Sequence, residues 1–170
     1  MKGRGKQPKG PEKQKRRVLI VDDHAVLREG LAMVINQELD LVVCGEAEDA
    51  PGALKLVGAA EPDVVIVDLS LVGGSGLELI HDIKAQRPDL PTLVLSLHDE
   101  TLHAERALRA GARGYVMKRA SATELLAALR KVLSGGIHLS EKMASLAAAW
   151  ETETRQTNHT RAGSGAQPSA

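Results

Sequence analysis

The chain has 170 residues, enough for one domain of roughly 100–150 residues with extensions at its ends. Hydrophobic residues make up 43% and aromatic residues only 1%, so the core must be built from aliphatic side chains. The single cysteine, Cys44, excludes an intramolecular disulfide framework, and we interpret it as a small buried hydrophobe. No apolar run is long enough to span a bilayer and no secretory signal is recognisable, so a cytoplasmic protein without a membrane partner is expected.

The formal net charge is zero, but the charges are distributed unevenly. Residues 1–17 carry eight lysines and arginines against Glu12 alone, so the rest of the chain is acidic. Because residues 1–16 hold almost no apolar side chains, we expect them to form a disordered basic arm. Contact with nucleic acid or an acidic partner is one interpretation of this arm, and a solubilising extension is the other.

After the arm, short apolar runs alternate with helical patterns five times. The runs are bounded by polar residues, as in strands that are buried on both faces, and lie at 18–21, 41–44, 64–67, 92–96 and 114–117. The helical patterns lie at 25–38, 50–61, 76–87, 100–110 and 122–134. Capping residues and a glycine stop mark the helix ends, namely Asp49, Ser75, Gly111 and Ser121.

This alternation predicts an α/β fold, in which one parallel sheet is covered by helices on both faces. With five strands, the leading arrangement is the flavodoxin-like (βα)5 doubly wound sheet with strand order 2-1-3-4-5. The domain is expected to span residues 17–134. A short helix within 140–150 makes 135–150 a connector, and the Thr-, Gly- and Ser-rich residues 151–170 are expected to be a disordered tail.

In this topology, four neighbouring strands carry polar side chains to one edge of the sheet. These side chains are Asp22 and Asp23, then Asp68, Ser96 and Lys118. Three carboxylates this close repel one another, so cations must offset them: Lys118 supplies one charge and Mg²⁺ would supply two. Each residue alone also has a purely structural interpretation, such as an acid that caps the next helix. Their convergence at one edge favours a functional site.

The chain resembles the response-regulator receiver domains of bacterial two-component signalling, and most of all the branch of the NarL and FixJ transcription regulators. Five motifs carry the resemblance, in order and at the expected spacings, within about residues 17–133. They are VLIVDDH at 18–24, VDLS at 67–70, SGLE at 75–78, LS at 95–96 and GARGYVMK at 111–118.

The resemblance implies that Asp68 is the phosphoacceptor. Its carboxylate would attack a phosphohistidine of a sensor histidine kinase and form an aspartyl phosphate. The resemblance also implies a Mg²⁺ site, with Asp23 and Asp68 as direct ligands, Asp22 as a ligand through water and Ser70 as a ligand through its backbone carbonyl.

The remaining motif residues would read the phosphorylated state. Lys118 would pair with a phosphoryl oxygen, Ser96 would hydrogen-bond another, and Tyr115 would turn inward as Ser96 moves. This would change the face formed by the fourth helix, the fifth strand and the fifth helix. Ser70 and His98 occupy the two variable positions that influence, in the family, how fast the phosphoryl group is lost.

The output is the largest departure from the family. Relatives of this branch continue into a helix-turn-helix DNA-binding domain, and this chain ends before one. We therefore expect either a fragment of a DNA-binding regulator, which contacts DNA only through the output domain, or a stand-alone receiver that acts through partners. A phosphorylation-dependent homodimer is a further expectation, with Ala104, Ala107 and Leu108 as a candidate face.

Two other function classes fit the sequence less well than the receiver. An aspartate-nucleophile phosphatase would also use Asp and Mg²⁺, but such enzymes usually carry a second acid two residues after the nucleophile, where this chain has Ser70. A nucleotide or flavin site would have a Gly-rich turn after the first strand, where Asp22, Asp23 and His24 stand instead. We therefore expect a phosphorylation-regulated signalling domain rather than an enzyme.

Overall fold

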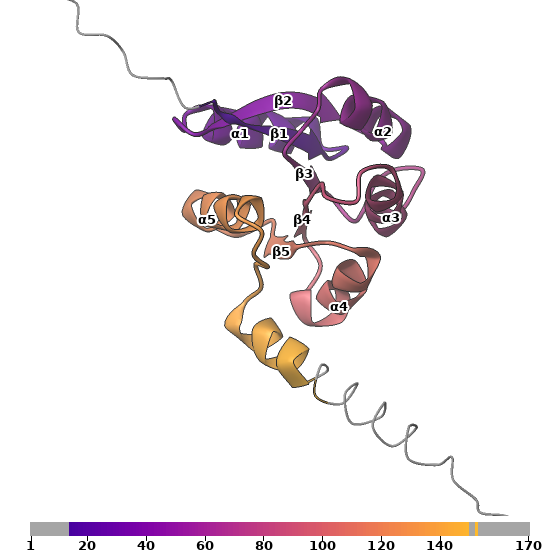
Figure 1. The fold of residues 1–170 in the computed structure, drawn as a ribbon, viewed down its shortest axis with the longest axis vertical. Coiled ribbons are helices and arrows are strands. Elements are labelled where there is room, and N and C mark those ends of the chain that lie inside the picture. The colour runs from indigo at the N-terminus through magenta and orange to yellow at the C-terminus, as the bar shows by residue number, and fades with distance from the viewer. Residues whose placement is uncertain (1–13, 150–151, 153–170) are drawn as a thin grey trace, which may run out of the picture.

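The computed structural model describes residues 14–149 and Thr152, and a five-stranded parallel sheet lies at its centre (Figure 1). The strands are β1 (Arg16–Val21), β2 (Leu41–Ala47), β3 (Val64–Val67), β4 (Thr92–Ser96) and β5 (Gly114–Met117). Their order is β2-β1-β3-β4-β5, which confirms the predicted topology. Residues 1–13 of the predicted basic arm at 1–16, and the predicted tail at 151–170 apart from Thr152, lie outside the described residues.

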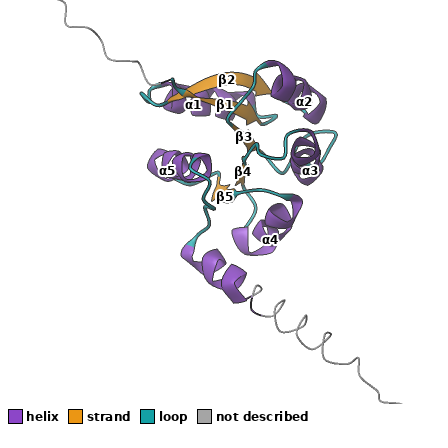
Figure 2. Ribbon diagram, viewed as in Figure 1, coloured by secondary structure: helices purple, strands orange, loops and turns teal. Residues whose placement is uncertain are grey.

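Five helices connect and cover the strands. They are α1 (Ala25–Asn36), α2 (Ala50–Ala59), α3 (Gly76–Gln86), α4 (Glu100–Ala110) and α5 (Ala122–Leu133). In Figure 2, α1 and α5 lie on one side of the sheet, and α2, α3 and α4 lie on the other. The flavodoxin-like doubly wound fold is therefore confirmed, with a helical layer on each face of the sheet.

The core consists of two apolar clusters, one on each face of the sheet. Because side chains alternate along a strand, Val18 and Ile20 of β1 pack toward α1 and α5, whereas Leu19 and Val21 pack toward α2, α3 and α4. All four side chains are fully buried, and each such burial contributes about 1.5–3 kcal/mol. Cys44 packs against the second of these clusters, and burial raises the pKa of its thiol, as expected for a small hydrophobe.

The N-terminal caps of the helices show that the acids after β1 are not used for capping. Three predicted caps are observed: Asp49, Ser75 and Ser121 each accept a hydrogen bond from a backbone N–H in the first turn of the next helix. The helix α1 differs, because its N-terminal cap is His24, whose side chain makes no capping hydrogen bond. Neither Asp22 nor Asp23 is therefore the N-terminal cap of α1. Helix capping, the simplest structural interpretation of these acids, is thus removed.

The segment after α5 returns along the edge of the sheet. His138 pairs with Gly114 in a parallel bridge, and its carbonyl accepts a hydrogen bond from Tyr115 N at 3.0 Å. Ser140 then precedes helical residues 141–149, within which the Met143 side chain is fully buried in the core. The segment predicted as a connector is thus attached to β5 by backbone hydrogen bonds and by apolar packing.

The structure contradicts the candidate dimer face on α4. Ala104 and Ala107 are fully buried because they point toward the sheet, and Leu108 is partly buried. These residues belong to the intramolecular core, so a second copy of the chain cannot contact the two alanines without unfolding α4. The prediction was wrong because the helix is rich in alanine, so its buried face is hard to recognise in the sequence.

A close backbone contact under the loop after β3 yields a stability prediction. A Cβ atom on Gly76 would lie 2.2 Å from Asp68 O and 2.6 Å from Leu69 Cα, so the backbone must shift. We expect Gly76→Ala to lower the free energy of unfolding in urea by about 1–3 kcal/mol. The control is Gly30→Ala in α1, where no atom lies within 4 Å, and which should raise stability by about 0.5–1 kcal/mol. Equal stability of Gly76→Ala and wild type would contradict this contact.

Candidate functional site

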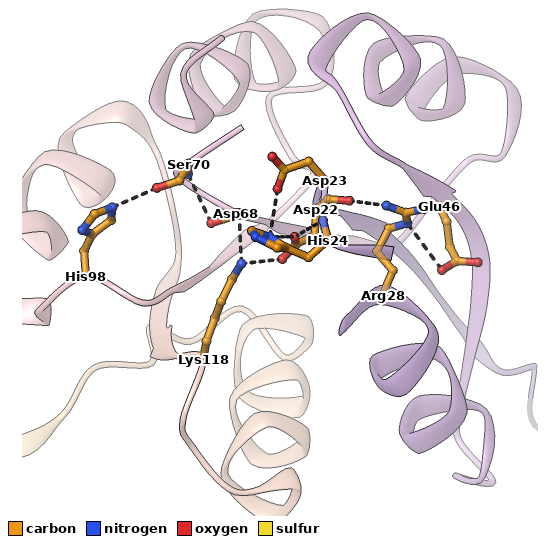
Figure 3. A network of polar contacts seen from close by, with 9 residues as sticks. All are labelled: Asp22, Asp23, His24, Arg28, Glu46, Asp68, Ser70, His98 and Lys118. Carbon is orange, nitrogen blue, oxygen red and sulfur yellow. Dashed lines mark hydrogen bonds and ion pairs between the residues drawn. The ribbon is translucent and has the colours of Figure 1, made fainter. Parts of the chain in front are cut away.

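An ion cluster occupies the carboxyl-terminal edge of the sheet (Figure 3). Asp22 follows β1 and Asp68 follows β3, and each residue is only 2% exposed. Lys118 follows β5 and reaches both acids: its Nζ lies 2.8 Å from Asp22 Oδ2 and 3.0 Å from Asp68 Oδ2. The structure therefore brings together three of the predicted site residues, which are up to 96 positions apart in the chain.

The second oxygen of Asp22 faces His24. Asp22 Oδ1 accepts a hydrogen bond from His24 N at 2.8 Å and lies 3.0 Å from His24 Nδ1. The same ring nitrogen lies 3.0 Å from Asp23 Oδ1. Asp22, Asp23, His24 and Asp68 each offer one potential ligand atom, and these atoms all lie within 4.8 Å of one another. The predicted acid Asp23 is thus part of the cluster, with His24 beside it.

Charge pairing keeps the buried groups ionised. Burial would raise the pKa of Asp22, but hydrogen bonds from Lys118 and His24 outweigh this effect and hold that pKa below its usual value. Burial would lower the pKa of Lys118, but its contacts with Asp22 and Asp68 raise that pKa above its usual value. Asp22 and Lys118 are therefore a charged pair at neutral pH.

The donor atoms fit a hard divalent cation. Asp22 Oδ2 and Asp23 Oδ1 are buried, and among residues 14–149 each is contacted by one charged or chargeable nitrogen, Lys118 Nζ for Asp22 and His24 Nδ1 for Asp23. Three formal carboxylate charges against one ammonium leave two negative charges, since −3 + 1 = −2. Mg²⁺ carries two positive charges and prefers oxygen ligands, so the residues present fit this ion.

The other predicted site residues, Ser70, Ser96 and Tyr115, meet at His98, and Ser70 also contacts Asp68. Ser70 N donates to Asp68 Oδ1 at 3.2 Å, and Ser70 Oγ lies 2.8 Å from His98 Nε2. His98 N donates to Ser96 Oγ at 3.1 Å, and Tyr115 OH donates to His98 O at 2.9 Å. The loop after β4 is therefore tied on one side to the loop after β3 and on the other to β5.

The ring of Tyr115 already points inward. The residue is 2% exposed, and burial raises the pKa of its phenol, which keeps the hydroxyl protonated as a donor. The resemblance implies an inward turn of this ring when Ser96 moves. In this structure the ring is buried while the Ser96 hydroxyl is still engaged with His98 N.

Sequence reasoning assigned no role to Arg28. One of its guanidinium nitrogens donates to the backbone carbonyl of Asp22 at 2.6 Å, and its Nε lies 3.8 Å from Glu46 Oε1. Arg28 thereby connects the loop that carries the acids to the end of β2. An arginine one turn after two acids is a weak signal, and its partner on β2 becomes apparent only once the strand order is known.

Comparison with known families agrees with this geometry. The family model for the response regulator receiver domain matches residues 18–130. The chain belongs to the response-regulator receiver family. Receiver domains bind Mg²⁺ at an acidic pocket, and Asp22, Asp23 and Asp68 form such a pocket here. Among the described residues, none of the helices has the length and apolar character needed to cross a bilayer.

Several transcription regulators are similar in sequence to this receiver. The transcriptional regulatory protein DegU of Brevibacillus brevis is 33% identical over 126 residues, which covers 74% of this chain and 53% of that protein. The oxygen regulatory protein NreC of Staphylococcus carnosus is 38% identical over 128 residues, which covers 75% of this chain and 59% of that protein. The chain thus spans between one half and three fifths of the length of these relatives.

Solved structures of response regulators are also similar to this chain. A two-component response regulator of the LuxR family from Aurantimonas sp. SI85-9A1 has a TM-score of 0.74 and 32% identity, covering 82% of this chain and 99% of that one. The receiver domain of NarL from Mycobacterium tuberculosis has a TM-score of 0.68 and 32% identity, covering 72% of this chain and 98% of that one. The predicted resemblance to the NarL branch is therefore confirmed.

The ion cluster leads to a prediction for Lys118. Lys118→Met removes the ammonium and leaves Asp22 and Asp68 as buried, mutually repelling carboxylates. Without divalent cations at pH 7, we expect the free energy of unfolding to fall by about 3–5 kcal/mol. Addition of Mg²⁺ should recover part of this loss because the ion offsets the same charges. The control is Lys142→Met, which removes an exposed lysine outside the cluster and should leave stability unchanged.

The difference in free energy of unfolding between wild type and Lys118→Met should depend on pH, and this dependence checks that the difference is electrostatic. Asp22 has a lowered folded pKa, so its contribution is present above its unfolded pKa of about 3.9 and is lost as pH falls through the folded value. Lys118 has a raised folded pKa, so its contribution is present below about 10.4 and is lost as pH rises through the folded value. A stability difference that is the same at pH 3 and pH 7 would contradict this origin.

Proposed function

We propose that this receiver accepts a phosphoryl group on Asp68 from a sensor histidine kinase and uses it to switch an output. The observation that carries the proposal is the placement of the Asp68 carboxylate. It lies at the end of a fully buried strand, one oxygen is bound by Lys118 and the other by Ser70 N, and two further acids lie beside it. A fixed carboxylate next to a cation site is what aspartyl phosphorylation requires.

In the transfer, an Asp68 oxygen forms a bond to phosphorus as the bond from phosphorus to the kinase histidine breaks. Asp23 and Asp68 would hold Mg²⁺ directly, Asp22 would hold it through water, and Ser70 would contribute its backbone carbonyl. When bound, Mg²⁺ offsets the charge of the transferring phosphoryl group. Lys118 Nζ, which already contacts Asp68 Oδ2 at 3.0 Å, would pair with a phosphoryl oxygen.

The response begins with the hydroxyl of Ser96. In the structure, this hydroxyl accepts a hydrogen bond from His98 N. To turn toward a phosphoryl oxygen, it must give up that hydrogen bond. His98 is in turn bonded to Tyr115 OH through its carbonyl, and its ring lies against His103 of α4, with 4.8 Å between the ring centroids. Movement of Ser96 would therefore reach both β5 and α4.

The connector is the proposed route for the output. Tyr115 N donates to His138 O, and Ser140 N donates to Glu100 Oε1 of α4 at 3.0 Å. His138 and Ser140 of the connector therefore contact β5 and α4, the two elements that His98 also contacts. We assign residues 17–134 to the receiver and residues 135–150 to a connector that carries its shape change.

Ser70 and His98 are the proposed determinants of phosphoryl lifetime. Their side chains are hydrogen-bonded at 2.8 Å and bridge the loops on two sides of Asp68. A bridge in this position restricts the approach of a water molecule to the phosphoryl group. The two family positions that influence phosphoryl loss thus act here as one unit.

The kinase and the output domain are the proposed partners. A cleft of about 290 Å³ between α1 and α5 has Leu27, Leu31, Val34 and Leu125 in its lining. Its lining also includes Lys118, which contacts Asp68, so a kinase helix bound there would lie near Asp68. The relative DegU is a transcriptional regulatory protein, and it is longer than the region matched. We therefore propose that DNA is contacted only through an output domain, with a cytoplasmic stand-alone receiver or homodimer as the alternative.

The test of the proposed function is phosphorylation of the purified chain. Incubation with acetyl phosphate and Mg²⁺ should add one phosphoryl group, detected by intact mass, and Asp68→Asn should abolish this addition. The matched control is Asp82→Asn, which changes an exposed acid of α3 and should label like wild type. Stoichiometric labelling of Asp68→Asn would refute the assignment. Continuous turnover of a small phosphate ester, lost in Asp68→Asn, would instead support the phosphatase alternative.

A second prediction concerns coupling through Tyr115. Tyr115→Phe removes the hydrogen bond to His98 O but keeps the buried ring and the backbone bond to His138. We expect it to lower the free energy of unfolding by about 0.5–1.5 kcal/mol and to leave labelling of Asp68 intact. Beryllofluoride should then shift the NMR signals around Asp68 as in wild type, but no longer those of Ser140 and Met143. If beryllofluoride still shifted the signals of Ser140 and Met143 as in wild type, the response would not pass through this hydroxyl.

A further inference from the structure

The backbone carbonyl of Asp22 is held by a side chain from α1. The strand β1 ends at Val21, and Asp22 N still donates to Ala47 O of β2 at 3.1 Å. The carbonyl of Asp22 accepts a hydrogen bond from a terminal guanidinium nitrogen of Arg28 at 2.6 Å. Figure 3 shows the Arg28 side chain between the loop that carries the acids and Glu46. Arg28 therefore fixes the peptide group that joins Asp22 to Asp23.

The direction of the Asp23 side chain depends on this peptide group. Asp22 is buried and its carboxylate is bound by Lys118 Nζ at 2.8 Å, so the side chain of Asp22 is held by its own contacts. The ion-pair partner of Asp23 is the neighbouring ring of His24, at 3.0 Å, and that side chain is 61% exposed. A contact with an exposed neighbour restrains a carboxylate weakly. The backbone must therefore supply the direction of Asp23, and Arg28 holds this backbone.

The guanidinium group of Arg28 is oriented in turn by Glu46 of β2. The Arg28 side chain is only 18% exposed, and its buried Nε lies 3.8 Å from Glu46 Oε1, which is an ion-pair distance. Glu46 directly precedes Ala47, whose carbonyl binds Asp22 N. The end of β2 thus supports the acid loop twice, directly through Ala47 and indirectly through Glu46 and Arg28.

We propose that Arg28 is a positioning residue for the cation site that serves Asp68. Through the carbonyl of Asp22 it keeps Asp23 directed toward the cluster, where one potential ligand atom from each of the three acids lies within 4.8 Å of the others. The planar fork of arginine can donate to a carbonyl from one nitrogen while another nitrogen faces a carboxylate, whereas the single ammonium of lysine cannot do both in this geometry. The inference rests on the proposed function, because it concerns how that site is assembled.

A purely electrostatic role for Arg28 predicts the opposite result. The three acids and Lys118 carry a formal charge of −2, and Arg28 adds a positive charge beside them. If only this charge mattered, its removal would strengthen the binding of Mg²⁺. If positioning matters, its removal weakens the binding of Mg²⁺, although the site becomes more negative. The sign of the change therefore separates the two roles.

The test is calorimetric titration of the full chain with Mg²⁺. Arg28→Met should weaken Mg²⁺ binding by about 10-fold, as is typical when the support of a metal ligand is lost. Arg28→Lys keeps the charge but not the fork, so it should weaken binding as well. The matched control is Arg106→Met, which removes an exposed arginine of α4 and should leave the affinity unchanged. Glu46→Gln should weaken binding less, and it should add little to the effect of Arg28→Met because both act through the same contact.

Labelling of Asp68 by acetyl phosphate gives a second readout. In Arg28→Met the half-saturating Mg²⁺ concentration should rise by about the same factor, whereas the labelling rate at saturating Mg²⁺ should stay close to that of wild type. Recovery at saturating Mg²⁺ also shows that the variant is folded.

Three outcomes would overturn the inference. They are unchanged or stronger Mg²⁺ binding in Arg28→Met, full retention of affinity in Arg28→Lys, and a labelling rate that stays low at saturating Mg²⁺, which would mean a general distortion of the site. The proposed function fails separately: wild type would then bind Mg²⁺ without labelling Asp68, while a loss of Mg²⁺ affinity in Arg28→Met and Arg28→Lys would still support the positioning role.

Discussion

The contact of one ammonium group with two buried carboxylates is the constraint on which the rest of the site depends. Lys118 reaches Asp22 and Asp68 only because β1, β3 and β5 end at the same edge of the sheet. The strands are buried on both faces, so these ends are rigid, and the close packing of Gly76 on Asp68 O leaves the backbone little freedom. The apolar core therefore offsets the cost of holding like charges together.

The proposed transmission of the signal depends on the contacts of His98. Four groups meet there: the Ser70 side chain, the Ser96 hydroxyl, the Tyr115 hydroxyl and the ring of His103. One residue, His98, is bonded to the loop after β3, to the end of β4 and to β5. The same contacts connect the proposed site of phosphoryl loss with the proposed route to the connector, so a coupling of lifetime and response is part of the proposal.

The sequence predicts the sheet and the acid edge well because both depend on local pattern. Buried strands and capping residues such as Asp49 and Ser121 are visible as short motifs, and the strand order then places Asp22, Asp68 and Lys118 together. The contacts of His24, Arg28 and His98 are not predictable in this way, because they depend on side-chain directions across different elements. The face of α4 that carries Ala104 and Ala107 was assigned to a dimer contact rather than to the core, because small alanine side chains are a weak sequence signal for burial.

The charge balance of the site favours a divalent ion in addition to Lys118 and bears on the proposed phosphorylation. The formal charge of the three acids and Lys118 is −2, and a bound divalent ion brings it to zero. Replacement of the Asp68 charge by a phosphoryl charge of about −1.5 to −2 then changes the balance by only about one unit. Without the ion, the same step would raise a net negative charge of two to about three in a largely buried site.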